Sequence, residues 1–121
     1  MHPFRAAVEA RDVPAAVALC REDVVFRSPV VFAPYTGRVA LTAILSAVIE
    51  VFEDFHYVRE IAGETDHVLV FRTRVGEREL EGADFLHYDA DGLIDEFTVM
   101  VRPLSAAHAL ADAMRAKLAP S

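Results

Sequence analysis

The residue best suited to chemistry in this sequence is Asp84, an acid that stands among apolar side chains. Residues 79–88 alternate as a β-strand does, and this alternation places Asp84 on one face with Leu80 and Leu86. Because burial disfavours a charged carboxylate, an enclosed Asp84 would have a raised pKa and could give a proton or a hydrogen bond to a ligand oxygen. A purely structural role, in which an arginine or a backbone group pairs with the carboxylate, is equally open.

Other patterns that could do chemistry have simpler explanations. The stretch from His87 to Ile94 resembles part of a calcium-binding loop, but it starts on a histidine and lacks the closing acid, and Asp91-Gly92 is typical of a hairpin turn. The histidines show no ligand spacing and have no cysteine partner, so we predict no metal site. No glycine elbow exposes a serine and no glycine-rich phosphate loop is present, so we predict no cofactor.

Composition limits the classes of protein that the chain can belong to. Its 121 residues suit one domain, 1–121, and 54% hydrophobic content is enough for a core. A formal charge of −7 opposes binding to nucleic acid or anionic lipid. No apolar stretch is long enough to span a membrane and the first residues lack the layout of a signal peptide, so we expect a cytoplasmic protein.

The order of the predicted elements favours an α+β fold. Phe4 and Val8 share the inner stripe of a first helix, and Asp12 is typical of the N-cap of a second helix that runs to about Cys20. The lone Cys20 is predicted to be a packed hydrophobe in this helix. The remaining spacing predicts a strand at 24–28, a long helix at 36–52, strands at 55–62, 67–75, 79–88 and 93–102, and a helix after Pro103.

This order resembles the nuclear-transport-factor-2-like superfamily, whose members include ketosteroid isomerase and the SnoaL-like polyketide cyclases. The resemblance covers nearly the whole chain, and its best local pieces are residues 22–29, 35–38 and 89–94. It implies a cone in which a curved antiparallel sheet wraps a long helix around a pocket, with an N-terminal helix pair and an extra C-terminal helix. Many members of the superfamily pair through the outer face of the sheet.

The ketosteroid isomerases allow a comparison residue by residue. Their hydrogen-bonding tyrosine falls on Phe4 and their aspartate base on Ser28, whereas their protonated oxyanion-hole aspartate falls on Asp84. The arginine-x-aspartate pair of the superfamily's epoxide hydrolases would become Gly82 and Asp84. The resemblance therefore implies the fold and the pocket, and it argues against both of these reactions.

Two functions remain open at this point. One is an isomerase, cyclase or hydrolase that acts on a small apolar oxygen-bearing compound, with Asp84 as acid or hydrogen-bond donor. The other is a non-catalytic ligand-binding or dimerisation module on the same fold. The loop between Pro29 and Pro34 is too apolar to be only solvated, so we expect it to fold over something. The residues predicted to contact the ligand are Phe4, Val8, Phe32, Ile44, Val48, Leu80, Leu86, Phe97, Val99 and Val101.

The same alternation predicts an opposite, outer face of the sheet, on which Glu96, Thr98, Met100 and Arg102 point away from Asp84. A face of mixed apolar and charged side chains suits a protein partner better than bare water, so we predict a homodimer. The residues expected at the dimer interface are Val70, Arg72, Arg74, Phe85, Thr98 and Met100.

Overall fold

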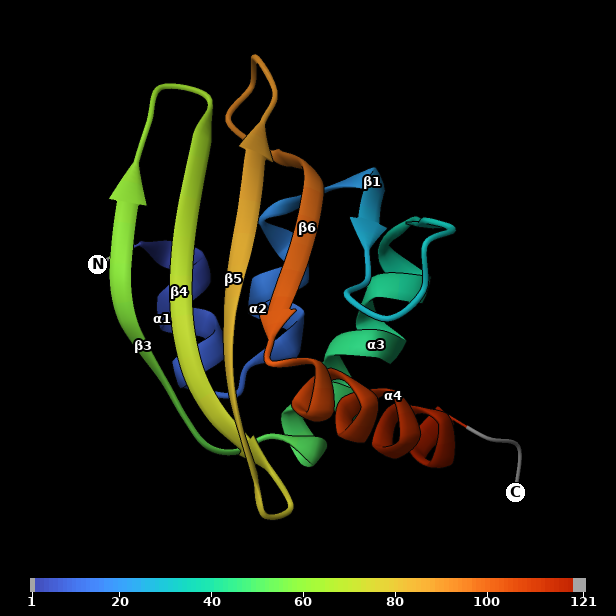
Figure 1. Cartoon of the computed structure of the whole chain (residues 1–121). Coiled ribbons are helices and arrows are strands. Elements are labelled where there is room, and N and C mark those ends of the chain that lie inside the picture. Colours follow the sequence, from blue (N-terminus) through green and yellow to red (C-terminus); the bar gives the residue numbers. More distant parts are fainter. Residues whose placement is uncertain (1, 119–121) are drawn as a thin grey trace.

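In the computed structural model, which describes residues 2–118, the chain forms four helices and a curved, open, six-stranded sheet (Figure 1). The α+β prediction is confirmed. The elements are α1 (Pro3–Glu9), α2 (Val13–Ala18), β1 (Cys20–Arg27), β2 (Tyr35–Thr36), α3 (Arg38–Val51), β3 (Glu53–Ala62), β4 (Asp66–Val75), β5 (Arg78–Tyr88), β6 (Ile94–Arg102) and α4 (Leu104–Leu118). Within residues 2–118, no helix combines the length and the apolar composition needed to cross a membrane.

The strands lie in the order β2-β1-β6-β5-β4-β3. One pair departs from the expected antiparallel pattern, since β1 runs parallel to β6 and places Phe26 opposite Phe97. The strand β1 also begins at Cys20, earlier than predicted, because an irregular register between Cys20 and Val25 lets the polar residues between them stay in the strand. Cys20 is therefore not helical, but it is fully buried, and burial raises the pKa of its thiol to about 11.

Helix α1 ends in a left-handed turn at Arg11. The Asp12 N–H donates to the Ala7 carbonyl at 2.8 Å and the Arg11 N–H donates to the Val8 carbonyl at 2.9 Å, which together form a Schellman motif. Arg11 has a φ of 58°, where glycine is usual and a side chain costs roughly 1–2 kcal/mol. Asp12 then caps α2 as predicted, and its Oδ1 accepts a hydrogen bond of 3.1 Å from the Ala15 N–H.

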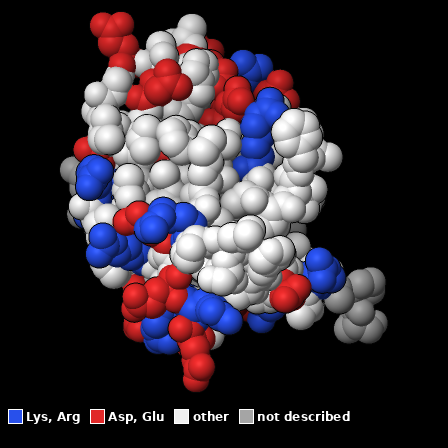
Figure 2. Space-filling view, in the orientation of Figure 1, with Lys and Arg blue, Asp and Glu red and all other residues white. Residues whose placement is uncertain are grey.

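The register of β5 and β6 confirms the predicted faces of the sheet. Asp84 lies opposite Val99 and Leu86 lies opposite Phe97, so Asp84 and Phe97 share the inner face. On the outer face the opposite pairs are Phe85 with Thr98, Ala83 with Met100, Glu81 with Arg102, and His87 with Glu96. Figure 2 views this outer face and shows charged side chains above and below a largely uncharged middle.

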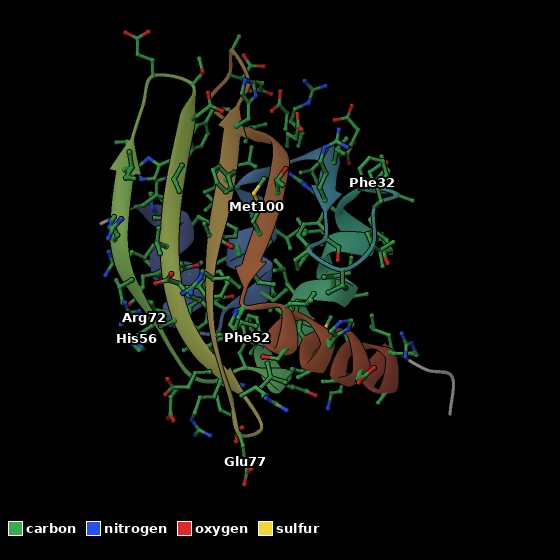
Figure 3. All side chains as sticks on the ribbon, in the orientation of Figure 1. Phe32, Phe52, His56, Arg72, Glu77 and Met100 are labelled. Atoms are coloured by element: carbon green, nitrogen blue, oxygen red, sulfur yellow. The ribbon has the colours of Figure 1, made fainter. Side chains whose placement is uncertain are left out.

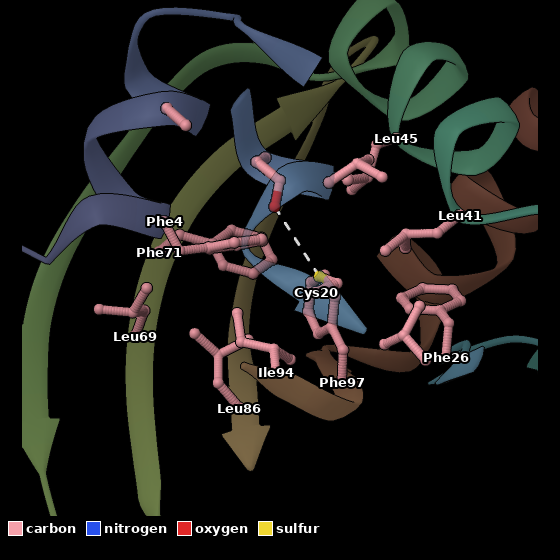
Figure 4. Packing of buried hydrophobic residues seen from close by; sticks show 14 of the residues in the cluster. Phe4, Cys20, Phe26, Leu41, Leu45, Leu69, Phe71, Leu86, Ile94 and Phe97 are labelled. Carbon is pink, nitrogen blue, oxygen red and sulfur yellow. Dashed lines mark hydrogen bonds between the residues drawn. The ribbon is translucent and has the colours of Figure 1, made fainter. Parts of the chain in front are cut away.

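The hydrophobic core lies between the inner face and the helices (Figure 4). There the ring of Phe97 meets Phe4 and Phe26 edge-on, at centroid distances of 5.2 and 5.1 Å. Phe71 on β4 lies opposite Gly82 on β5, and its ring covers the glycine, because a Cβ atom at Gly82 would lie only 2.3 Å from Phe71 Cζ. Glycine at this position therefore lets the far end of the Phe71 ring come close to the neighbouring strand.

Candidate functional site

A cavity of about 510 Å³ lies between the inner face of the sheet and the helices. Its walls are mainly apolar, and its volume falls within the roughly 300–1,000 Å³ that is typical of small-molecule sites. Of the residues predicted for the site, those that line this cavity are Phe4, Val8, Ile44, Val48, Asp84, Phe97 and Val99.

The other predicted contact residues lie outside the cavity. Leu80 and Leu86 share the face of Asp84 but are buried in the packed core, and Val101 packs against that core. Strand parity fixes the side on which a residue lies and not its position along the strand, so it cannot separate the core from the cavity. Phe32 is fully exposed at the rim of the molecule (Figure 3), because the loop turns its neighbours Val30 and Val31 toward the cavity instead.

Asp84 and Tyr57 form a buried polar pair on the cavity wall. The Tyr57 hydroxyl donates a hydrogen bond of 3.0 Å to Asp84 Oδ2. Asp84 is only 6% exposed, and no Lys, Arg or His side chain in residues 2–118 forms an ion pair with its carboxylate. The structural alternative of an arginine partner therefore does not apply to the described residues.

Burial sets the protonation of this pair. It raises the pKa of the Asp84 carboxyl to about 7, and the hydrogen bond from Tyr57 opposes this rise because it stabilises the ionised form. The pKa of Tyr57 is raised by burial and then by the charge of Asp84, so its hydroxyl remains a donor. A carboxyl with a pKa near 7 is present in both forms at neutral pH, so it is suited both to accept and to give a proton.

Sequence reasoning did not identify Tyr57. Its signal was the alternation of Phe55 and Tyr57, which places two aromatic side chains on one face of the predicted strand 55–62. Nothing in the local sequence pairs that strand with Asp84, since β4 lies between β3 and β5. In the structure, Phe55 stacks on Phe52 at 5.8 Å, and the Arg5 guanidinium lies 5.7 Å from the centroid of the Tyr57 ring.

The described residues contain no cluster of side chains suited to binding a metal ion. No group of three or more His, Cys, Asp or Glu side chains in residues 2–118 is arranged to bind one. In the stretch that resembles a calcium loop, Asp89 Oδ1 accepts hydrogen bonds of 2.9 Å from the N–H groups of Asp91 and Leu93. This carboxylate therefore shapes the β5–β6 turn.

Residues 2–97 match the family model of the SnoaL-like domain. The chain belongs to this family. A steroid delta-isomerase from Pseudomonas aeruginosa is 43% identical to this SnoaL-like chain, with a TM-score of 0.90 over 95% of this chain and 85% of the other. A protein with a cystatin-like fold from Silicibacter pomeroyi DSS-3 is 36% identical, with a TM-score of 0.90 over 97% of this chain and 86% of the other. No curated protein matches the sequence at a significant level.

The positions that were compared with ketosteroid isomerase all line the cavity of this SnoaL-like protein. Phe4 is fully buried and brings no hydroxyl to the wall. Ser28 is half-buried, and its Oγ accepts a hydrogen bond of 3.1 Å from the Val30 N–H. The hydroxyl beside Asp84 thus comes from Tyr57 on β3, and not from position 4 on α1.

Proposed function

We propose that this SnoaL-like protein is an enzyme that moves a proton within a small, largely apolar carbonyl or enol compound, with Asp84 as the acid–base group. One observation carries the proposal. The buried Asp84 carboxyl lines an apolar cavity, Tyr57 holds its Oδ2, and no group in residues 2–118 donates a hydrogen bond to its Oδ1. Oδ1 is therefore the atom that a ligand would meet.

The proposed proton transfer needs no co-reactant. Ionised Asp84 takes a proton from the carbon next to the carbonyl, and the electron pair of the broken C–H bond forms a C=C bond while negative charge moves to the carbonyl oxygen. Protonated Asp84 then returns the proton to another carbon of the conjugated system, which completes an isomerisation. A pKa of about 7 for Asp84 suits both steps at neutral pH.

The similarity to a protein named as a steroid delta-isomerase supports isomerisation as the type of reaction. The residues at the cavity wall limit what this similarity says about the substrate. Phe4 and Ser28 stand where ketosteroid isomerases have a tyrosine and an aspartate base, so the proposal extends to proton transfer on an apolar carbonyl compound and not to a steroid.

The same two positions favour a second candidate, a ligand-binding protein without catalysis. With Phe4 and Ser28 in place, Asp84 has no carboxylate partner on the cavity wall at the position of the family's base. In this case the Asp84–Tyr57 pair would only bind a ligand oxygen.

Deuterium exchange distinguishes the two candidates. A panel of apolar ketones and unsaturated ketones is incubated with the protein in D₂O, and proton NMR follows deuterium uptake beside the carbonyl. We expect enzyme-dependent uptake for at least one compound, its loss in Asp84→Asn, and unchanged uptake in Ser46→Ala, an exposed position on α3 that does not line the cavity. Binding without uptake for every compound would contradict the enzyme and favour the binding protein.

A further inference from the structure

The acidic and the basic residues at the cavity mouth differ in how far they are already paired within the protein. Besides Asp84, the acids that line the cavity are Glu9, Asp12 and Asp54, and each already has a partner. Glu9 accepts a hydrogen bond of 2.6 Å from Arg5, and Asp54 accepts one of 2.6 Å from Arg74. Asp12 Oδ1 caps α2. These carboxylates are therefore engaged within the protein.

The arginines that line the same cavity have fewer and weaker partners within the protein. The exposed side chain of Arg11 makes no hydrogen bond or ion pair with residues 2–118. Lys117 already pairs with Glu50 and lowers the pKa of that acid, and the charge of Arg11 contributes only weakly to this lowering. Among residues 2–118, Arg115 on α4 pairs only with Asp112, at 3.4 Å, and both side chains are more than three-quarters exposed. Such an exposed pair holds an arginine weakly, so both guanidinium groups are free to meet an anion.

The backbone supports a functional reason for Arg11. It occupies the left-handed position of a Schellman motif, where glycine or asparagine is the usual residue. Asp54, the other non-glycine residue with positive φ within residues 2–118, lines the same cavity. Strained residues of this kind cluster at functional sites, where the surrounding structure holds them in place.

We infer that the ligand of this cavity is amphipathic, with an apolar body inside and an anionic group, such as a carboxylate, held at the mouth by Arg11 and Arg115. The inference rests on the proposed function, because it takes the same cavity as the substrate site. It adds a direction of binding. The anionic end stays between the α1–α2 turn and α4, and the carbonyl carried by the apolar body reaches Asp84 on the inner wall. Guanidinium groups suit this role, since they pair with planar carboxylates through two parallel hydrogen bonds.

Calorimetric titration with a phenylhexanoic acid and its amide tests this inference without any turnover. Both probes have the same apolar body and differ in charge at neutral pH. We expect the native protein to bind the acid about five- to tenfold more tightly than the amide at low ionic strength, and added salt to remove the difference. Asp84→Asn should keep this preference, so a failure of the proposed reaction would be seen separately.

Variants identify the arginines responsible. Arg11→Asn removes the charge while suiting the left-handed backbone, and it should weaken binding of the acid without weakening binding of the amide. Arg115→Gln on α4 should act in the same way and serves as the second variant. The control is Arg59→Gln, an exposed arginine on β3 that does not line the cavity, and it should change neither affinity. Equal affinity for acid and amide, absence of binding by both, or an equal effect of all three variants would overturn the inference.

Discussion

The hydroxyl of Tyr57 and the carboxyl of Asp84 meet across an intervening strand. Tyr57 lies on β3 and Asp84 on β5, with β4 between them, and 3.0 Å separates the hydroxyl oxygen from Oδ2. No group in residues 2–118 donates a hydrogen bond to Oδ1, and the bond to Oδ2 couples the protonation of the carboxyl to the position of the phenol. The predictions about chemistry depend on this contact.

Tyr57→Phe should raise the pKa of Asp84 above about 7. The substitution removes a donor that favours the ionised carboxylate and leaves the burial that opposes it. A hydrogen bond to a charged group contributes about 1.5–3 kcal/mol, so its loss should raise the pKa of Asp84 by about one to two. NMR titration measures it, with Tyr35→Phe as control because Tyr35 lines the same cavity without contacting Asp84. An unchanged midpoint in Tyr57→Phe would show that the bond does not form in solution.

Asp84→Asn should change how stability depends on pH. The folded pKa of about 7 exceeds the unfolded value of about 3.9, so the folded chain binds more protons in this interval. The contribution of Asp84 to stability is therefore complete below about pH 4 and is lost as the pH rises toward 7. Asparagine does not titrate, so the variant should gain stability relative to the native chain over this range, by at most about 1.4 kcal/mol per pH unit. Urea unfolding at several pH values measures the gain, and a difference that stays constant with pH would contradict the raised pKa.

Gly82→Ala should destabilise the fold by about 1–3 kcal/mol, which is usual for overpacking of a core. The new methyl group would lie 2.3 Å from Phe71 Cζ, and Phe71 is only 1% exposed, so its ring has to move. Adding Phe71→Leu should recover part of the loss. Thermal unfolding of the two single variants and the double variant gives the coupling between these positions. Additive effects would mean that the ring does not cover the glycine.

We also propose that the chain forms a homodimer through the outer face of its sheet. Val70, Ala83 and Met100 lie in one row across β4, β5 and β6, and Phe85 and Thr98 lie opposite one another on β5 and β6. Met100 is 59% exposed and Phe85 is 38% exposed. Arg72 and Arg102 flank this area and both pair with Glu81, at 3.3 and 3.4 Å.

Light scattering should give twice the mass of the chain, and Met100→Glu should reduce it to one chain by burying a charge at the interface. Val39→Glu is the matched control, because Val39 is exposed on α3 and the charge change is the same. A single-chain mass for the native protein in dilute solution would remove this proposal.

Local patterns explain which parts of the fold were predictable. The two-residue period of a strand placed Asp84, Phe97 and Val99 on one face, and the Asp12 cap depends on neighbouring residues alone. Long-range pairing was not predictable in this way. The parallel contact of β1 with β6, and the meeting of Tyr57 with Asp84, depend on how distant strands align.

The same limit applies to the cavity. Leu80, Leu86 and Val101 have the correct parity, but the helices decide which part of the inner face stays open and which is packed. The path of the loop after β1 decides that Val31 faces the cavity and Phe32 does not. Neither feature produces a periodic pattern in the sequence, so neither could be predicted from it.

The most direct test of the central claim is the pKa of Asp84 in the folded native protein, measured by carbon-detected NMR of its carboxyl group over a range of pH. Burial disfavours the ionised carboxylate and the Tyr57 hydrogen bond favours it, so we predict a midpoint of about 7, with both forms present at neutral pH. A midpoint at or below the ordinary value of about 3.9 would contradict this prediction, because burial would then not keep any of Asp84 in its neutral, proton-donating form at neutral pH.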